Sequence, residues 1–172
     1  MNKKRNWKID CIIIAIGTQI AYGSPSTQPL DTKLIKQGEY LVKIGGCNDC
    51  HTPDYLLSGG KTPKKLWLTG SSFGWKGPWG TTYPPNLRIF VESLTETAWL
   101  EMAKQLKTRP PMPWYVLHDM KEEDLRAIYH FIRSIGAEGK PAPQYLPPGK
   151  EPTTPYALFP SPPSSKDTNV TK

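Results

Sequence analysis

Apolar residues recur three and four positions apart in three stretches of the chain, and this spacing places them on one face of an α-helix. The three stripes are Leu34, Ile35, Gly38, Leu41 and Val42; Trp99, Met102, Ala103 and Leu106; and Leu125, Ile128, Tyr129 and Ile132. We therefore expect three helices that each bury one face, and an all-α fold class for the domain that they build.

Residues near the ends of these stretches predict where the helices begin and stop. Asp31 and Thr32 can cap the first helix. Capping boxes, in which a capping side chain is followed three residues later by Glu, open the second and third helices: Ser93 with Glu96, and Asp119 with Glu122. Gly136 is expected to stop the third helix, because glycine readily takes the left-handed conformation that ends many helices.

Two further regions show no periodicity. Residues 52–92 are rich in Gly, Pro, Ser and Thr, and we expect them to form a long ordered loop that wraps something. Residues 139–172 hold nine of the chain's nineteen prolines, so we expect a partly disordered Pro-rich tail without regular structure. Apolar residues could still pin the earlier part of this tail to the domain: Tyr145, Leu146, Tyr156, Leu158 and Phe159.

Residues 1–23 have the three parts of a signal peptide. A basic segment, residues 3–8, precedes a short apolar core from Cys11 to Ile20, and Ala21-Tyr22-Gly23 has the small residues of a cleavage site. A retained membrane anchor is the alternative, but about ten apolar residues are too few to cross a bilayer, which needs roughly twenty. We therefore predict export with cleavage near Gly23 and no membrane span in the mature chain, which has one domain over residues 24–138 before the tail.

The charge of the chain adds little to this picture. Residues 1–23 contain four basic residues and one acidic residue, so their removal lowers the formal net charge from +7 to +4. The remaining basic residues are scattered, whereas nucleic-acid binding calls for a basic stripe, and we expect no nucleic-acid partner. Lys61, Lys64 and Lys65 form one local cluster, which is either a docking patch for an acidic partner or, as we favour, a solvated loop.

The strongest chemical signal is Cys-Asn-Asp-Cys-His at residues 47–51. From the composition, a Cys-x-x-Cys-His pattern is expected by chance in about one such chain per thousand, and it is the attachment motif of c-type haem. One helical turn would bring both sulfurs to the two vinyl groups of a porphyrin, and His51 would follow with its imidazole toward the iron. We predict one covalent haem, with Cys47 and Cys50 as the attachment residues.

Other interpretations of this motif explain it less fully. A thioredoxin-like redox pair uses the thiols but leaves His51 without a role, and the chain lacks the alternating strands and helices of that fold. A zinc site would have to recruit His118 and His130 to reach four ligands. A structural disulfide between Cys47 and Cys50 would close a small, strained ring.

Three segments give the chain a resemblance to a known family: GEYLVKIGGCNDCHTP at residues 38–53, GPWGTTYPPNL at residues 77–87, and RPPMPWYVLHDMKEEDLRAIYHFIRS at residues 109–134. Together they resemble the class I cytochromes c, especially single-haem periplasmic cytochromes of Gram-negative bacteria. The resemblance spans residues 34–134. It implies a small cytochrome c fold of three to four helices wrapped round one haem c, and a location in the periplasm.

The resemblance also implies roles for single residues. Gly38 matches the small residue where the first and last helices cross, and Tyr129 matches the aromatic residue that packs on it. Pro85 matches the proline whose carbonyl accepts a hydrogen bond from the proximal histidine, although Pro84 could serve instead. Aromatic residues with one polar atom suit a haem edge near a propionate, and this loop holds four of them: Trp67, Trp75, Trp79 and Tyr83. We take Trp79 and Tyr83 as the cofactor-binding pair.

The second axial ligand decides the function. Met112 lies in Arg-Pro-Pro-Met-Pro-Trp, where the flanking prolines forbid a helix and limit the freedom of the backbone. Met102 is explained by the apolar stripe of its helix, and Met120 has no distinctive setting. His118 is the main alternative and would give a bis-histidine haem. We therefore predict His51 and Met112 as the axial ligands of the iron.

A haem with both axial positions filled transfers electrons, whereas an open position permits chemistry on small molecules. We expect an electron-transfer protein that is not an enzyme, working in a periplasmic respiratory or dehydrogenase chain. Its expected partners are redox proteins, either a periplasmic dehydrogenase, a terminal oxidase or both. The alternative is a haem enzyme or gas sensor with an open distal iron site.

Overall fold

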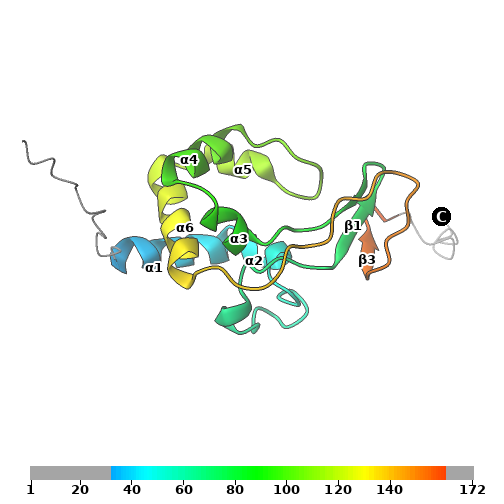
Figure 1. Cartoon of the computed structure of the whole chain (residues 1–172), viewed down its shortest axis with the longest axis horizontal. Helices are drawn as coiled ribbons and strands as arrows, with labels where there is room; N and C mark the ends of the chain where they lie inside the picture. The colour runs from blue at the N-terminus through cyan, green and yellow to red at the C-terminus, as the bar shows by residue number, and fades with distance from the viewer. Residues whose placement is uncertain (1–31, 162–172) are drawn as a thin grey trace, which may run out of the picture.

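The computed structural model describes residues 32–161 (Figure 1). The predicted signal peptide and its cleavage site lie outside this part of the chain. The described elements, in order, are α1 (Thr32–Ile44), α2 (Cys47–His51), the 3₁₀ turn η1 (Lys64–Leu66), β1 (Gly74–Gly77), β2 (Gly80–Thr82), α3 (Leu87–Glu92), α4 (Glu96–Gln105), α5 (Trp114–Asp119), α6 (Glu122–Ile135) and β3 (Tyr156–Leu158). Within residues 32–161, no helix has the length and apolar character needed to cross a membrane.

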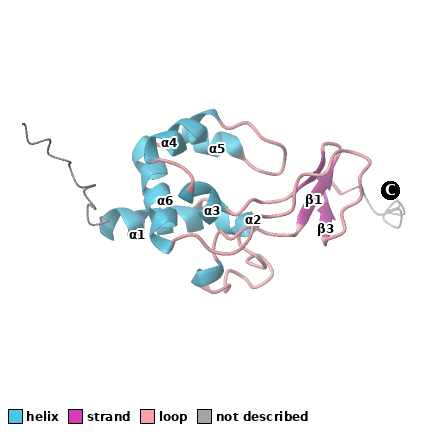
Figure 2. Cartoon of the chain, viewed as in Figure 1, coloured by secondary structure: helices cyan, strands magenta, loops and turns pink. Residues whose placement is uncertain are grey.

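The expected all-α fold class is wrong. Residues 32–161 form six α-helices and a three-stranded mixed sheet, rather than three to four helices alone (Figure 2). The sheet has the order β2-β1-β3, with β2 antiparallel and β3 parallel to β1. Its strands are three or four residues long, which is too short for the alternation of polar and apolar residues that reveals a strand in a sequence.

The sheet is built from the two regions that we expected to lack regular structure. Residues 52–92 supply the hairpin of β1 and β2 as well as α3, and the Pro-rich tail supplies β3. Leu146 also exchanges two backbone hydrogen bonds with Thr81, at 2.8 and 3.0 Å. The tail is therefore pinned to the hairpin, as predicted, through backbone pairing at Leu146 and β3, a Tyr145 hydrogen bond, and ring contacts of Phe159 with Trp75 and Trp79.

The helical body forms around the crossing of α1 and α6, at the end of the molecule opposite the sheet (Figure 1). Gly38 lies at this crossing, because a Cβ atom added there would be 1.9 Å from the carbonyl oxygen of Ala127. The close approach confirms the predicted small residue, but its nearest neighbours belong to Ala127 and Phe131 rather than Tyr129. The Tyr129 hydroxyl instead donates a hydrogen bond to the carbonyl of Leu94, at 3.0 Å.

Both predicted capping boxes are wrong, although the helices that they were meant to open are present. Thr95 caps α4 and accepts a hydrogen bond from the Ala98 amide at 3.2 Å, while Ser93 ends the preceding helix α3. Asp119 is the last residue of α5, and the N-cap of α6 is Lys121, which makes no side-chain capping bond. The short helices α3 and α5 occupy these positions, and six residues are too few to show a helical period. Gly136 ends α6, as predicted, although its φ +68° and ψ 168° differ from the left-handed helical conformation.

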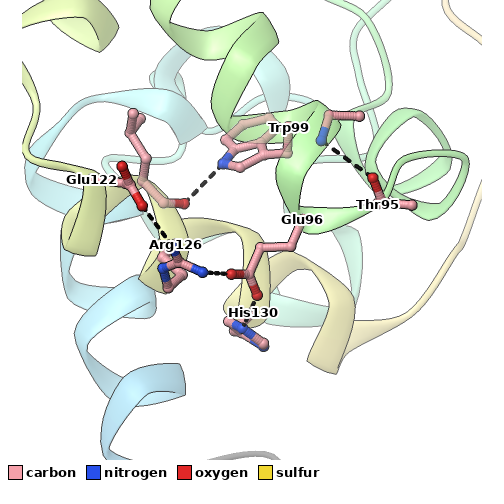
Figure 3. Close-up of polar contacts among 8 residues, drawn as sticks. Thr95, Glu96, Trp99, Glu122, Arg126 and His130 are labelled. Carbon is pink, nitrogen blue, oxygen red and sulfur yellow. Dashed lines mark hydrogen bonds and ion pairs between the residues drawn. The ribbon is translucent and has the colours of Figure 1, made fainter. Parts of the chain in front are cut away.

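Polar contacts join α4 to α6 (Figure 3). The Trp99 indole N–H donates to the carbonyl of Leu125 at 2.8 Å, in a buried setting. On the surface beside it, Glu96 pairs with Arg126 and lies 2.7 Å from Nε2 of His130. These contacts hold α4 against the last helix and fix one wall of the cavity described below.

Candidate functional site

The Cys-x-x-Cys-His motif forms α2, a single helical turn at the wall of a cavity of about 730 Å³. Gly46 precedes this turn with φ +68°, a conformation that glycine adopts without strain. Cys47, Cys50 and His51 all line the cavity, and the two thiols are not bridged. The volume lies within the roughly 300–1,000 Å³ that is typical of ligand and cofactor sites.

His51 is held in one orientation by the backbone. It is 7% exposed, and its Nδ1 lies 2.8 Å from the carbonyl oxygen of Pro85. Burial lowers the pKa of the imidazole, and the bond to Pro85 opposes this effect only in part. A neutral ring that donates its Nδ1 proton to Pro85 keeps a lone pair on Nε2, which is the form that ligates a metal. The Pro84 carbonyl accepts from the Ser71 amide instead, so Pro85, and not Pro84, supplies the carbonyl that faces His51.

Buried polar groups fix α2 from behind. Thr52 donates to the side-chain oxygen of Asn48 at 2.7 Å and accepts from the amide of Leu68 at 2.8 Å. The Gly70 amide donates to the carbonyl of His51, also at 2.8 Å. Asn48 and Thr52 are 0% and 2% exposed, so these bonds are shielded from water. The turn that carries the thiols is thus rigidly attached to residues 68–70.

The thiols do not have the character of a redox pair. Burial raises the pKa of Cys47 to about 11, and burial together with the charge of Asp49 raises the pKa of Cys50. Reactive dithiols need a lowered pKa to form the nucleophilic thiolate. The zinc interpretation also lacks support, because Nε2 of His118 is bonded to the Leu106 carbonyl and Nε2 of His130 to Glu96. Within residues 32–161, no three His, Cys, Asp or Glu side chains gather into a metal site.

Residues 106–113, which we call the distal segment, form another part of the cavity wall and carry Met112. The segment is not helical, as its prolines predict, and Met112 is half-buried. The Trp114 amide donates to the Met112 carbonyl at 2.9 Å across Pro113, whose φ −81° and ψ 63° are those of an inverse γ-turn. Met102 and Met120 also line the cavity, whereas His118 does not.

The four aromatic residues predicted near the haem edge lie in three places: the cavity wall, the hairpin and the helical core. Trp75 and Tyr83 line the cavity, whereas Trp79 does not. The Trp79 ring contacts Phe159, and its buried indole nitrogen has no hydrogen-bond partner among the described residues. Trp67 packs in the helical core. Of the predicted pair, the structure therefore brings Tyr83 to the cavity and leaves Trp79 at the hairpin.

Sequence reasoning missed the part of the cavity wall that the tail contributes. Residues 141–145 line the cavity beside Thr82 and Arg109. No motif marks these positions, because they reach the site only through the pairing of the tail with the hairpin. The complete wall combines two thiols and an imidazole on α2 with a thioether on the distal segment, and most of the remaining lining is apolar. This donor set and the volume of the cavity fit a covalently attached haem.

Comparison with known proteins gives one informative similarity. The chain is 29% identical over 140 residues to the protein named "Alcohol dehydrogenase (quinone), cytochrome c subunit" of Gluconobacter oxydans. The similarity covers 75% of this chain and 27% of that protein, so the chain spans about a quarter of its relative's length. No family model matches the chain. No solved structure matches it either. The similarity supports a relation to cytochromes c and an electron-carrying role in general terms.

Proposed function

We propose that this protein is a single-haem c-type cytochrome that carries one electron at a time in a periplasmic respiratory or dehydrogenase chain. The observation that carries the proposal is the placement of Cys47, Cys50 and His51 on one turn at the cavity wall, with His51 fixed by Pro85 at 2.8 Å. A covalently bound haem would supply a one-electron couple at this site. The cytochrome subunit from Gluconobacter supports the same class of function.

The roles of the residues follow from their surroundings. Cys47 and Cys50 would attach the haem by thioether bonds, and His51 and Met112 would be its axial ligands. Tyr83 and Trp75 would lie at its edge. His118 is disfavoured as a ligand because its Nε2 is bonded to the Leu106 carbonyl at 2.9 Å. The proposal includes export and a redox partner of the dehydrogenase type.

The lysine cluster adds little to this proposal. Lys64 pairs with Glu39 at 2.6 Å and lies 5.9 Å from the centre of the Trp67 ring, so it is engaged within the chain. For Lys64, this favours our interpretation of the cluster Lys61, Lys64 and Lys65 as surface charges of a loop rather than a dedicated docking patch.

Intact mass of the purified, denatured protein tests the attachment. We expect the mass of a chain that begins near Ser24 plus one haem, and loss of stable attachment in the double variant Cys47→Ala/Cys50→Ala. A protein that lacks the added mass would refute the proposal.

The ferric spectrum tests the second ligand. Methionine ligation gives a long-wavelength sulfur-to-iron band, which Met112→Ala should abolish. The matched control is Met102→Leu, which also alters a cavity-lining methionine and should keep the band. A five-coordinate haem in the unmutated protein would favour an enzyme or gas sensor instead.

A further inference from the structure

The distal segment is held partly by residues that are far from it in the sequence. Near its ends, two of its carbonyls accept hydrogen bonds from the adjoining helix α5. The Leu106 carbonyl accepts from the His118 ring, and the Met112 carbonyl accepts from the Trp114 amide. Between these points the segment contacts two other parts of the chain. The hydroxyl of Thr82, in β2, donates to the carbonyl of Pro110 at 2.9 Å. The guanidinium carbon of Arg109 lies 3.7 Å from the centre of the Tyr145 ring.

Tyr145 is itself fixed to the hairpin. Its hydroxyl donates to the carbonyl of Trp79 at 2.7 Å, and the next residue, Leu146, pairs with Thr81. The ring is half-buried and lines the cavity, whereas Arg109 is exposed. A guanidinium stacked on a tyrosine face is attracted by the π-electrons of the ring. The hairpin therefore holds the distal segment twice, directly through Thr82 and indirectly through Tyr145.

We propose that Thr82 and Tyr145 are positioning residues for Met112, so that the Pro-rich tail helps to set how firmly the distal ligand is presented to the cavity. The inference rests on the proposed function, because it takes Met112 as the axial ligand. The prolines limit the conformations of the segment, but exposed residues such as Lys107 and Arg109 leave it few buried contacts of its own. Loss of the contact made by Thr82 or Tyr145 should therefore raise the fraction of molecules in which Met112 has moved away from the cavity wall.

The test uses the haem-loaded protein and the rate at which carbon monoxide binds the ferrous form, because this ligand enters only when Met112 has left. Tyr145→Ala should raise the rate about fivefold, the order expected from one lost cation–π contact. Thr82→Val should raise it by a similar factor through the lost hydrogen bond. Tyr145→Phe keeps the ring beneath Arg109, so its rate of carbon monoxide binding should be closer to that of the unmutated protein. Tyr156→Ala is the matched control, since this tyrosine belongs to the same tail but contacts Lys76 in β1.

A second readout does not depend on the iron. Trypsin cleavage after Lys107 reports opening of the distal segment, and it should quicken in Tyr145→Ala and Thr82→Val but not in Tyr156→Ala. If Tyr145→Ala fails to fold, Arg109→Gln removes the other partner of the same contact from an exposed position. Where both single variants fold, the double variant Arg109→Gln/Tyr145→Ala should bind carbon monoxide and be cleaved at rates close to those of either single variant, because both substitutions remove the same contact.

The outcomes separate this inference from the proposed function. If the unmutated protein has a sulfur-to-iron band but carbon monoxide binding and cleavage are unchanged in Tyr145→Ala, Thr82→Val and Arg109→Gln, the positioning role is overturned and the cytochrome assignment stays intact. Equal effects of Tyr145→Ala and Tyr156→Ala would also overturn it, because they would show a general effect of the tail. A protein with covalent haem but no such band would overturn both the Met112 assignment and this inference.

Discussion

Two parts of the cavity wall, α2 and the distal segment, are held by different means. α2 is anchored from behind by the amides of Leu68 and Gly70, which donate to Thr52 and to the carbonyl of His51. Thr52 is nearly inaccessible to water, and the His51 ring is fixed by Pro85. The distal segment is half-exposed and depends on the neighbouring helix α5 and on anchors in the hairpin and tail. One side is therefore rigid and carries the proposed attachment residues, and the other opens more easily and carries Met112, the proposed second ligand.

The largest effect is expected at the helix crossing that supports the rigid side. Gly38→Ala would place a methyl group 1.9 Å from the Ala127 carbonyl, so α1 would have to move away from α6. Because α1 leads directly into α2, the free energy of unfolding should fall by about 3 kcal/mol, at the upper end of usual overpacking costs. Urea denaturation measures this loss. The exposed neighbour Gln37→Ala is the control, and equal midpoints for the two variants would show that the crossing can relax.

Thr52→Val tests the polar anchor of α2 itself. The substitution keeps the shape of the side chain but leaves the buried Leu68 amide without an acceptor and the Asn48 oxygen without a donor. We expect the free energy of unfolding to fall by about 2 kcal/mol, the usual cost of an unsatisfied buried polar group. Thr69→Val is the matched control, because the Thr69 hydroxyl bonds to the Leu66 carbonyl near the surface. A loss no larger than in this control would mean that the Thr52 hydrogen bonds contribute little to holding α2.

The two sides also differ in how far they could be predicted from the sequence. The chemistry of α2 is contained in five consecutive residues, so the motif identified Cys47, Cys50 and His51 together. Met112 could also be singled out, because its flanking prolines are adjacent to it, and the structure brings it to the same cavity, while its role as a ligand stays a prediction. Thr82 had no signal, and Tyr145 was expected only to pin the tail to the domain. Their contacts with the distal segment depend on the pairing of the tail with the hairpin, between residues that are far apart in the chain.

The same reasoning explains the errors in the fold. The helices with strong stripes, α1, α4 and α6, were found from their periodicity alone. The sheet was missed because its three- and four-residue strands lie in Gly- and Pro-rich segments, where local composition favours loops. Their pairing depends on the tail returning to the hairpin, which no local pattern records. The capping residues were wrongly assigned because Ser93 and Asp119 lie at the C-terminal ends of the short helices α3 and α5, which the sequence did not reveal.

His118→Phe tests the bond that joins α5 to the distal segment, and we expect it to lower stability less than Thr52→Val does. Phenylalanine keeps a ring beside Trp114, 5.0 Å away between ring centres, but removes the bond from Nε2 to the Leu106 carbonyl. We expect about 1 kcal/mol of lost stability and an unchanged sulfur-to-iron band in the ferric spectrum. Tyr115→Phe, an exposed change on the same helix, should lie within about 0.5 kcal/mol of the unmutated protein. Disappearance of the band in His118→Phe would instead indicate that His118 influences or provides the ligand.

The smallest effect is expected at His130, which lies on α6 beside Glu96 and Arg126 (Figure 3) and does not line the cavity. Burial and the charge of Arg126 lower its pKa from the ordinary value of 6.5, so the folded protein takes up this proton less readily than the unfolded chain. The associated stability is therefore fully present above pH 6.5 and is lost as the pH falls through the lowered pKa. His130→Gln should reduce the fall in urea midpoint over this range, and the difference between the two proteins isolates His130 from groups that titrate in both. Identical falls would show that Glu96, 2.7 Å from Nε2, offsets the cost of charging the ring.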